Sequence, residues 1–171
     1  MKRRRGAQGF SLIEVVVAVA VFAIAVVSVL LVLPTLARQT SRSADLLVVQ
    51  GLPSAIRSEM RRLAAGGFDA FAASLPVMTP TPTEGYQMVG ARDGLRLTSL
   101  TADNGEVSES EHYFLIELWR FSAPPLGFVG GQSGALAVHV RVSWPYRLPG
   151  AANATRLAER EQVTFAVAIN R

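Results

Sequence analysis

Glu14 is the residue whose chemistry needs explaining first, because it lies near the start of an otherwise apolar run. The run extends from Phe10 to Leu33, and its only other polar residues are Ser11 and Ser28. A carboxylate placed toward the interior of a membrane costs about 2.5–3.5 kcal/mol, so a partner that neutralises it would explain its presence. The alternative is a local role, in which an acid near a helix start complements the helix dipole and reaches back to the membrane surface.

A second group of polar residues could offer oxygen ligands to a metal ion. Asp103, Asn104 and Glu106 lie close together, with Glu109 and Glu111 just beyond them. Oxygen ligands suit calcium, but the segment lacks the spacing of an EF-hand loop. We expect a solvated acidic loop without a metal. The alternative is a calcium site, for which Asp103, Asn104 and Glu106 are the candidate ligands.

The residues that enzymes use most often for proton transfer and nucleophilic attack do not form a recognisable set. His112 and His139 are the only histidines, and cysteine is absent. His139 falls on the polar side of an alternating segment, where we expect it at the surface. The segment GQSG, residues 131–134, misses the spacing of a nucleophile elbow. We therefore expect a protein that is not an enzyme and needs no cofactor.

The net charge of +4 comes entirely from the start of the chain. Four of the 17 basic residues are Lys2, Arg3, Arg4 and Arg5, and the remaining 13 balance the 13 acids. Nucleic-acid binding generally requires a basic patch or stripe, which the rest of the sequence lacks. We therefore expect no nucleic-acid partner.

The apolar run is long enough to cross a membrane. About 24 residues of helix extend roughly 36 Å, more than the hydrocarbon core of a bilayer requires. The basic residues before the run place the N-terminus in the cytoplasm by the positive-inside rule. A cleaved secretory signal peptide and a plain membrane anchor are two explanations of such a segment. The run exceeds the usual length of a signal-peptide core, however, and a plain anchor leaves Glu14 without a specific role.

A third explanation comes from the seven residues GFSLIEV, numbers 9–15, and the basic leader before them. They resemble the type III signal of type IV pilins and type II secretion pseudopilins. The resemblance implies that a prepilin peptidase cuts on the cytoplasmic side between Gly9 and Phe10 and methylates the new amine of Phe10. It also implies that Glu14 pairs with the N-terminal amine of a neighbouring subunit and sets the register of assembly.

The same resemblance implies a structural protein, a subunit of a type II secretion pseudopilus or of a type IV pilus. Its expected partners are other pilin or pseudopilin subunits, the prepilin peptidase, an inner-membrane assembly platform and membrane lipid. The expected location is the bacterial inner membrane, crossed once with the C-terminal domain in the periplasm, and later a periplasmic filament. The missing cysteines and the segment VRVSWPYR are more similar to a minor subunit than to a major one. The alternative is a membrane-anchored periplasmic binding module that does not polymerise.

Beyond the apolar run, the sequence predicts that the helix continues with an amphipathic face. Pro34 is expected to kink the helix or to mark its exit from the membrane. A kink or short break is expected at residues 51–53 (Gly-Leu-Pro), and the glycines at positions 66 and 67 should end the helix. The apolar positions recur at spacings of three and four residues: Val49, Leu52, Ile56, Met60 and Leu63.

The predicted fold is α+β, a long N-terminal helix packed on an antiparallel sheet of about four strands. Residues 68–93 look irregular, except for a short edge strand at residues 86–89. The strands expected after it are residues 95–100, 112–121, 136–144 and 163–169, of which the last two alternate apolar and polar residues. The expected division is a cleaved leader at 1–9, a transmembrane and filament-core helix at 10–33, an amphipathic helix at 34–67, and a periplasmic β-rich domain at 68–171 packed on residues 34–67.

Overall fold

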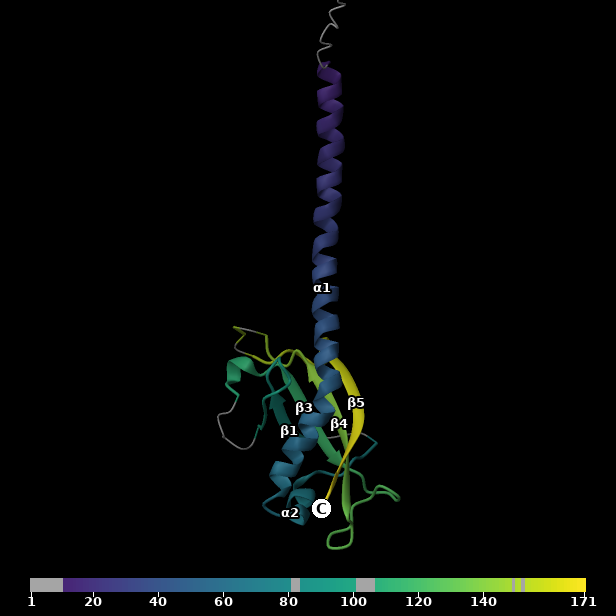
Figure 1. The fold of residues 1–171 in the computed structure, drawn as a ribbon, viewed down its shortest axis with the longest axis vertical. Coiled ribbons are helices and arrows are strands. Elements are labelled where there is room, and N and C mark those ends of the chain that lie inside the picture. Colours follow the sequence, from purple (N-terminus) through teal and green to yellow (C-terminus); the bar gives the residue numbers. More distant parts are fainter. Residues whose placement is uncertain (1–10, 81–83, 101–106, 149, 152) are drawn as a thin grey trace, which may run out of the picture. The chain divides into compact units, whose positions relative to one another are not determined.

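The structure is a computed structural model that describes residues 11–80, 84–100, 107–148, 150–151 and 153–171. The chain divides into two compact units, Met1–Ala44 and Asp45–Arg171. In its described part, the first unit consists of the beginning of helix α1 (Leu12–Ala64). The second unit contains the end of this helix and every strand (Figure 1).

Helix α1 continues without interruption through both positions at which the sequence predicts a disturbance. Pro34 and Pro53 lie inside the helix, although each proline removes one backbone hydrogen bond. The break considered at residues 51–53 does not occur, because Leu52 is fully buried against the sheet and this packing holds the helical conformation there. Ser54 also donates a hydrogen bond of 2.8 Å from its hydroxyl to the carbonyl of Gly51. The helix ends at Ala64, just before the glycines that were expected to stop it.

An antiparallel sheet of five strands, in the order β2-β1-β3-β4-β5, forms the second layer of the fold. The predicted α+β architecture is therefore confirmed, with five strands in place of about four. The additional strand is the segment expected as a short edge strand at residues 86–89. It lies inside the sheet instead, where it pairs with a strand on each side and has Met88 and Val89 fully buried. The strands are β1 (Tyr86–Gly90), β2 (Leu97–Ser99), β3 (Phe114–Arg120), β4 (Ala135–Trp144) and β5 (Glu161–Asn170).

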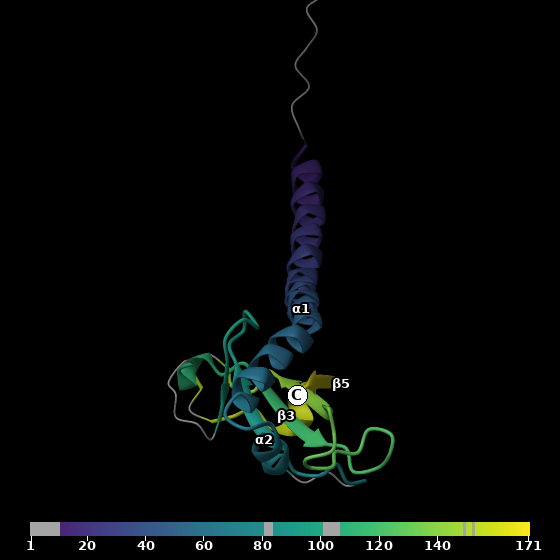
Figure 2. The same cartoon turned by 60° about the horizontal axis from the view of Figure 1, so that its bottom comes forward.

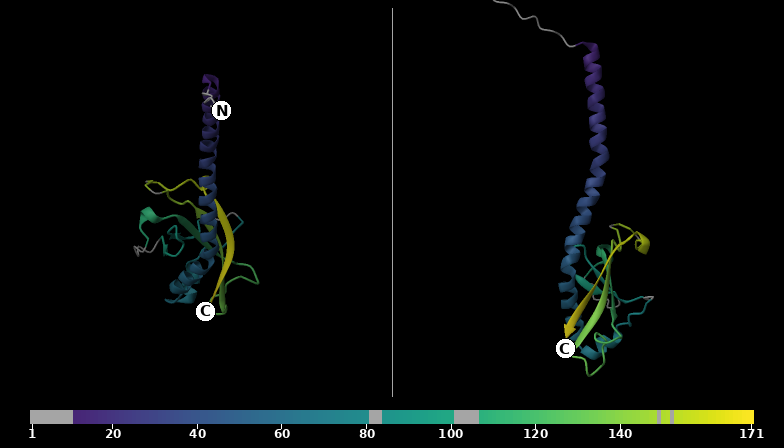
Figure 3. Two further views of the ribbon diagram at one scale, coloured as in Figure 1. Left: turned by 45° about the horizontal axis from the view of Figure 1, so that its top comes forward. Right: turned by 90° about the vertical axis from the view of Figure 1, so that its right-hand side faces the viewer.

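The core lies between one face of this sheet and the end of α1. Strands β3 and β4 pair in a register that places Ile116 opposite Val142 and Leu118 opposite Val140. These side chains share one face of the sheet because alternate residues of a strand point the same way. Figure 3 shows the end of α1 lying along that face. The helix contributes four buried residues to the core, Val49, Leu52, Ile56 and Met60.

A short helix that the sequence analysis missed closes one end of the core. Helix α2 (Phe68–Ser74) lies within the segment expected to be irregular, next to the end of α1 (Figure 2). Its seven residues are too few for a clear helical period, but Phe71 and Ala72 are buried. The ring of Phe71 meets that of Tyr86 edge-on, with the centroids 6.0 Å apart.

Strand β5 forms one edge of the sheet and pairs only with β4. Its ten residues alternate between side chains that pack toward the core and side chains that are exposed on the opposite face. No charged residue lies between positions 162 and 170. The exposed side chains are Gln162, Thr164, Ala166, Ala168 and Asn170.

Candidate functional site

The first turn of α1 holds Glu14 in a reciprocal capping arrangement with Ser11. The backbone N–H and the hydroxyl of Ser11 donate to Oε2 of Glu14, at 2.9 and 3.1 Å, and the N–H of Glu14 donates to the Ser11 hydroxyl at 3.3 Å. Such a pair satisfies amide groups that have no partner within the helix. Glu14 therefore has a local capping contact at the helix start. The bonds from Ser11 all end on Oε2, so Oε1 of Glu14 takes no part in them.

The side chains that follow Glu14 form a long apolar surface. All residues from Ser11 to Leu36 are exposed, including large ones such as Leu12, Phe22 and Leu31. Among the described residues, α1 is the one helix long and apolar enough to cross a membrane. An exposed surface of this kind requires a membrane or other apolar partners to cover it.

Several residues singled out in the sequence lie outside the described part of the structure. They are Gly9 and Phe10 at the expected cleavage point, and the candidate calcium ligands Asp103, Asn104 and Glu106. Two acids close to the calcium candidates are described, and both are bound by arginines. Glu109 pairs with Arg147 at 2.9 Å, and Glu111 pairs with Arg96 at 2.9 Å. Within the described ranges, no three acids or histidines gather as a metal site would require.

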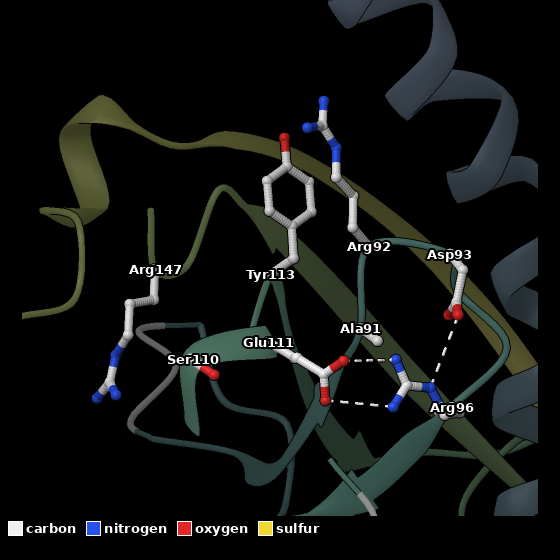
Figure 4. A pocket seen from close by; sticks show the side chains of 8 residues that line it. All are labelled: Ala91, Arg92, Asp93, Arg96, Ser110, Glu111, Tyr113 and Arg147. Atoms are coloured by element: carbon white, nitrogen blue, oxygen red, sulfur yellow. Dashed lines mark hydrogen bonds and ion pairs between the residues drawn. The ribbon is translucent and has the colours of Figure 1, made fainter. Parts of the chain in front are cut away.

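Glu111 and Arg96 form part of the wall of a pocket of about 300 Å³ beside the turn between β1 and β2. Figure 4 shows the Arg96 guanidinium facing both oxygens of Glu111, with Asp93 on its other side at 3.7 Å. Hydrogen bonding to Arg96, and then to Ser108, lowers the pKa of Glu111 to about 2. Bonding to Arg147 likewise lowers the pKa of Glu109. These acids therefore stay ionised and are poorly suited to proton transfer near neutral pH.

Above this pocket, a buried carboxylate on α1 binds two side chains from the sheet. Asp45 accepts hydrogen bonds from Nε and Nη2 of Arg92 at Oδ1, both 3.2 Å, and from the Tyr113 hydroxyl at Oδ2, 2.7 Å. The Arg92 guanidinium also lies over the Tyr113 ring, 4.8 Å from its centroid. Burial, and then the bond to Asp45, raises the pKa of Tyr113 to about 12. The sequence analysis missed this group, although Asp45 precedes Val49 by four residues and so continues the apolar stripe of the helix.

The opposite face of the sheet carries a second ion pair, between Glu117 and Arg141. Nη2 of Arg141 lies 2.7 Å from Oε2 of the buried Glu117, and its guanidinium lies over the Trp119 ring. His139 is next to this pair, near the rings of Trp119 and Phe121. It lies on the polar side of β4, as expected, but it is half-buried instead of fully at the surface. Burial, and then the charge of Arg141, lowers the pKa of His139.

The other histidine has a structural contact of its own. His112 is buried, and its Nε2 lies 3.2 Å from the carbonyl oxygen of Val107. The two histidines thus lie in separate surroundings, and the nearby carboxylates are held by arginines. The described residues present paired charges that tie elements of the fold together.

Comparison with known proteins places a recognised motif at the N-terminus. The family model described as the prokaryotic N-terminal methylation motif matches residues 4–30. No curated protein matches the chain, and no solved structure matches it. The matched range contains Gly9, Phe10 and Glu14, together with most of the exposed apolar surface of α1.

Proposed function

We propose that the chain is a structural subunit of a type II secretion pseudopilus or a type IV pilus, on the premise that it carries the methylation motif of pilin-like subunits. The motif indicates a structural subunit and not an enzyme. The observation that carries the proposal is the position of the motif, which covers the start of α1, where every side chain from Ser11 to Leu36 is exposed. The fold supports the proposal. The apolar first part of the long helix suits a membrane or a filament core, and the part of the helix packed on the antiparallel sheet suits the solvent.

The proposed processing begins with cleavage between Gly9 and Phe10 by the prepilin peptidase, followed by methylation of the Phe10 amine. Cleavage creates an ammonium group four residues before Glu14 on the same chain. We assign the second oxygen of Glu14, Oε1, to the corresponding ammonium of a neighbouring subunit. Such a pair is far stronger in an apolar filament core than in water. A subunit that slipped along the filament axis would leave one of these charges without its partner, so the pair also sets the register.

The proposed location follows from the basic leader and the apolar helix. Residues 1–9 stay on the cytoplasmic side, residues 10–33 cross the inner membrane, and the remainder lies in the periplasm. Extraction into a filament requires an assembly platform in the inner membrane, and the other partners are further pilin or pseudopilin subunits and membrane lipid. We propose a minor subunit, because the segment VRVSWPYR and the missing cysteines are more similar to a minor subunit than to a major one.

Intact-mass analysis of the protein extracted from bacterial membranes tests the proposal. We expect a chain that has lost residues 1–9 and gained one methyl group at Phe10. A matched strain without the prepilin peptidase should yield the full-length chain. An uncleaved N-terminus in the presence of the peptidase would instead favour a membrane-anchored binding module that does not polymerise. A chain beginning after Ala37 would establish ordinary signal-peptide cleavage.

A further inference from the structure

Polar contacts of Asp45, together with the partly buried Val48, hold the first packed turn of α1 on the sheet. Asp45 is the first buried residue among the helix side chains that the structure describes, with 6% of its surface exposed. The two apolar residues that follow it point away from the core, since Leu46 and Leu47 are 47% and 69% exposed. The first buried apolar residue is Val49, one turn further on. The carboxylate of Asp45 is therefore the polar attachment of this turn, beside the apolar contact of Val48.

The two partners of Asp45 come from separate parts of the sheet. Arg92 lies in the turn after β1, and Tyr113 lies directly before β3. Together they use both oxygens of the carboxylate, and their own stacking keeps them side by side (Figure 4). Hydrogen bonds to a charged group are stronger than those between neutral groups. Asp45 thus joins the helix to two strands through one side chain.

Backbone hydrogen bonds that do not involve the helix hold the segments that carry both partners. The turn that carries Arg92 is closed by bonds from the Ala91 N–H to the Arg96 carbonyl, 3.1 Å, and from the Gly94 N–H to the Ala91 carbonyl, 2.9 Å. Tyr113 donates its N–H to Gly90 at 2.9 Å. Because these bonds already order the backbone, the contact has to order only the side chains of its two partners, which limits its entropic cost.

We propose that Asp45, Arg92 and Tyr113 form a latch that holds residues 45–49 of α1 on the sheet. Release of the latch frees these residues while the deeper core, around Leu52, Ile56 and Met60, stays packed. The latch lies where the packed part of the helix begins. If the proposed function holds, it is therefore the first contact loaded when the subunit is pulled by its N-terminal segment. The latch itself does not depend on that function.

The absence of cysteine allows a direct test on the full-length chain in detergent micelles. A single thiol is introduced by Val49→Cys, beneath the latched turns, or by Val140→Cys, in the centre of the sheet, and its labelling rate by a maleimide is measured. Both side chains are buried and undergo the same chemical change. The first thiol reports opening of the helix turn, and the second reports unfolding of the sheet.

The latch is removed by Asp45→Asn and, more mildly, by Tyr113→Phe, which deletes a single oxygen. We expect either change to raise the labelling rate at position 49 by about tenfold or more and to leave the rate at position 140 unchanged. The control is Glu59→Gln, a buried acid of the same helix whose partner, Arg62, lies in that helix at 2.6 Å. The control should leave the labelling rates at both positions unchanged.

Three results would overturn the latch. The first is a rate at position 49 that neither Asp45→Asn nor Tyr113→Phe raises. The second is an equal rise at positions 49 and 140, which would mean general destabilisation of the unit. The third is a rise at position 49 in Glu59→Gln as large as in the latch variants. Labelling requires neither processing nor assembly, so a failure here is distinct from a failure of the proposed filament role.

Discussion

At the scale of single residues, the capping contact of Glu14 and its proposed role in assembly can be separated by the same variants. Its bonds to Ser11 cap the helix, and glutamine serves this purpose nearly as well as glutamate. Pairing with a neighbour's ammonium requires a charge, which glutamine lacks. The difference between the two side chains therefore isolates the role in assembly.

We predict that Glu14→Gln and Glu14→Ala both insert in the membrane and are cleaved after Gly9, yet both fail to enter filaments. Removing one partner of a buried ion pair costs about 3–5 kcal/mol. The measurement is the fraction of each variant in sheared or crosslinked filaments, with Ser11→Ala as the control that weakens the cap and retains the charge. Assembly of Glu14→Gln at the wild-type level would show that capping alone explains the acid.

We predict that Arg96→Gln raises the pKa of Glu111 from about 2 toward its ordinary value of 4.5, and that the bonds from Ser108 keep it below that value. Because the folded pKa lies below the unfolded one, the stability from this pair is present above about pH 4.5 and is lost as the pH falls toward 2. An NMR titration of the Glu111 carboxyl measures the shift. Arg156→Gln, at an exposed position, serves as the control. An ordinary pKa for Glu111 in the unaltered protein would contradict the ion pair.

Single-residue chemistry was predictable from the sequence only where it is local. Glu14 was identified because a charge within an apolar run contrasts with its immediate neighbours. Asp45 escaped notice because its partners lie 47 and 68 positions away in the chain. No local pattern connects an acid on a helix with an arginine in a turn and a tyrosine before a strand. These contacts could therefore be recognised only from the three-dimensional structure.

At the scale of elements, the sequence was most informative where one face of a strand is buried. The alternation of β4 and β5 predicted both strands, and the apolar spacing predicted the packed face of α1. Strand β1 was misplaced at the edge because its five residues are too few to show that both faces are buried. Helix α2 was missed for the same reason of length. The break considered at residues 51–53 was overridden by tertiary packing, which outweighs local propensity.

We predict that Gly94→Ala weakens the contact between the β1–β2 turn and α1. Gly94 has a φ of +70°, and a Cβ there would lie 2.6 Å from the Val48 side chain. The unfavourable backbone conformation alone costs roughly 1 kcal/mol or more. Denaturant unfolding of both variants measures the loss, with Gly130→Ala as the control, since a Cβ at Gly130 meets nothing within 4 Å. Equal stability of the two variants would argue against the close approach of turn and helix.

At the scale of the whole molecule, the division at Asp45 predicts which truncations fold. A chain that begins at Thr35 keeps Asp45, Val49, Leu52 and Ile56, and we expect it to be soluble, with a cooperative thermal transition. A chain that begins at Arg57 loses all four of these contacts. Removal of a single buried leucine or isoleucine side chain costs about 2–5 kcal/mol, so we expect the shorter chain to be unfolded or aggregated. Circular dichroism with heating distinguishes the two, and a cooperative transition in the shorter chain would contradict the assigned core.

The edge formed by β5 has a consequence for the behaviour of the protein at high concentration. Natural sheets usually protect their edges with lysine, proline or a bulge, but residues 162–170 contain neither a charge nor a proline. The purified domain should therefore tend to form fibrillar aggregates through strand-to-strand pairing, most readily when partners are absent. A lysine placed by Thr164→Lys, on the exposed face, should delay this aggregation without affecting the core. We thus expect the chain to aggregate less within an ordered assembly than during long storage as a free monomer.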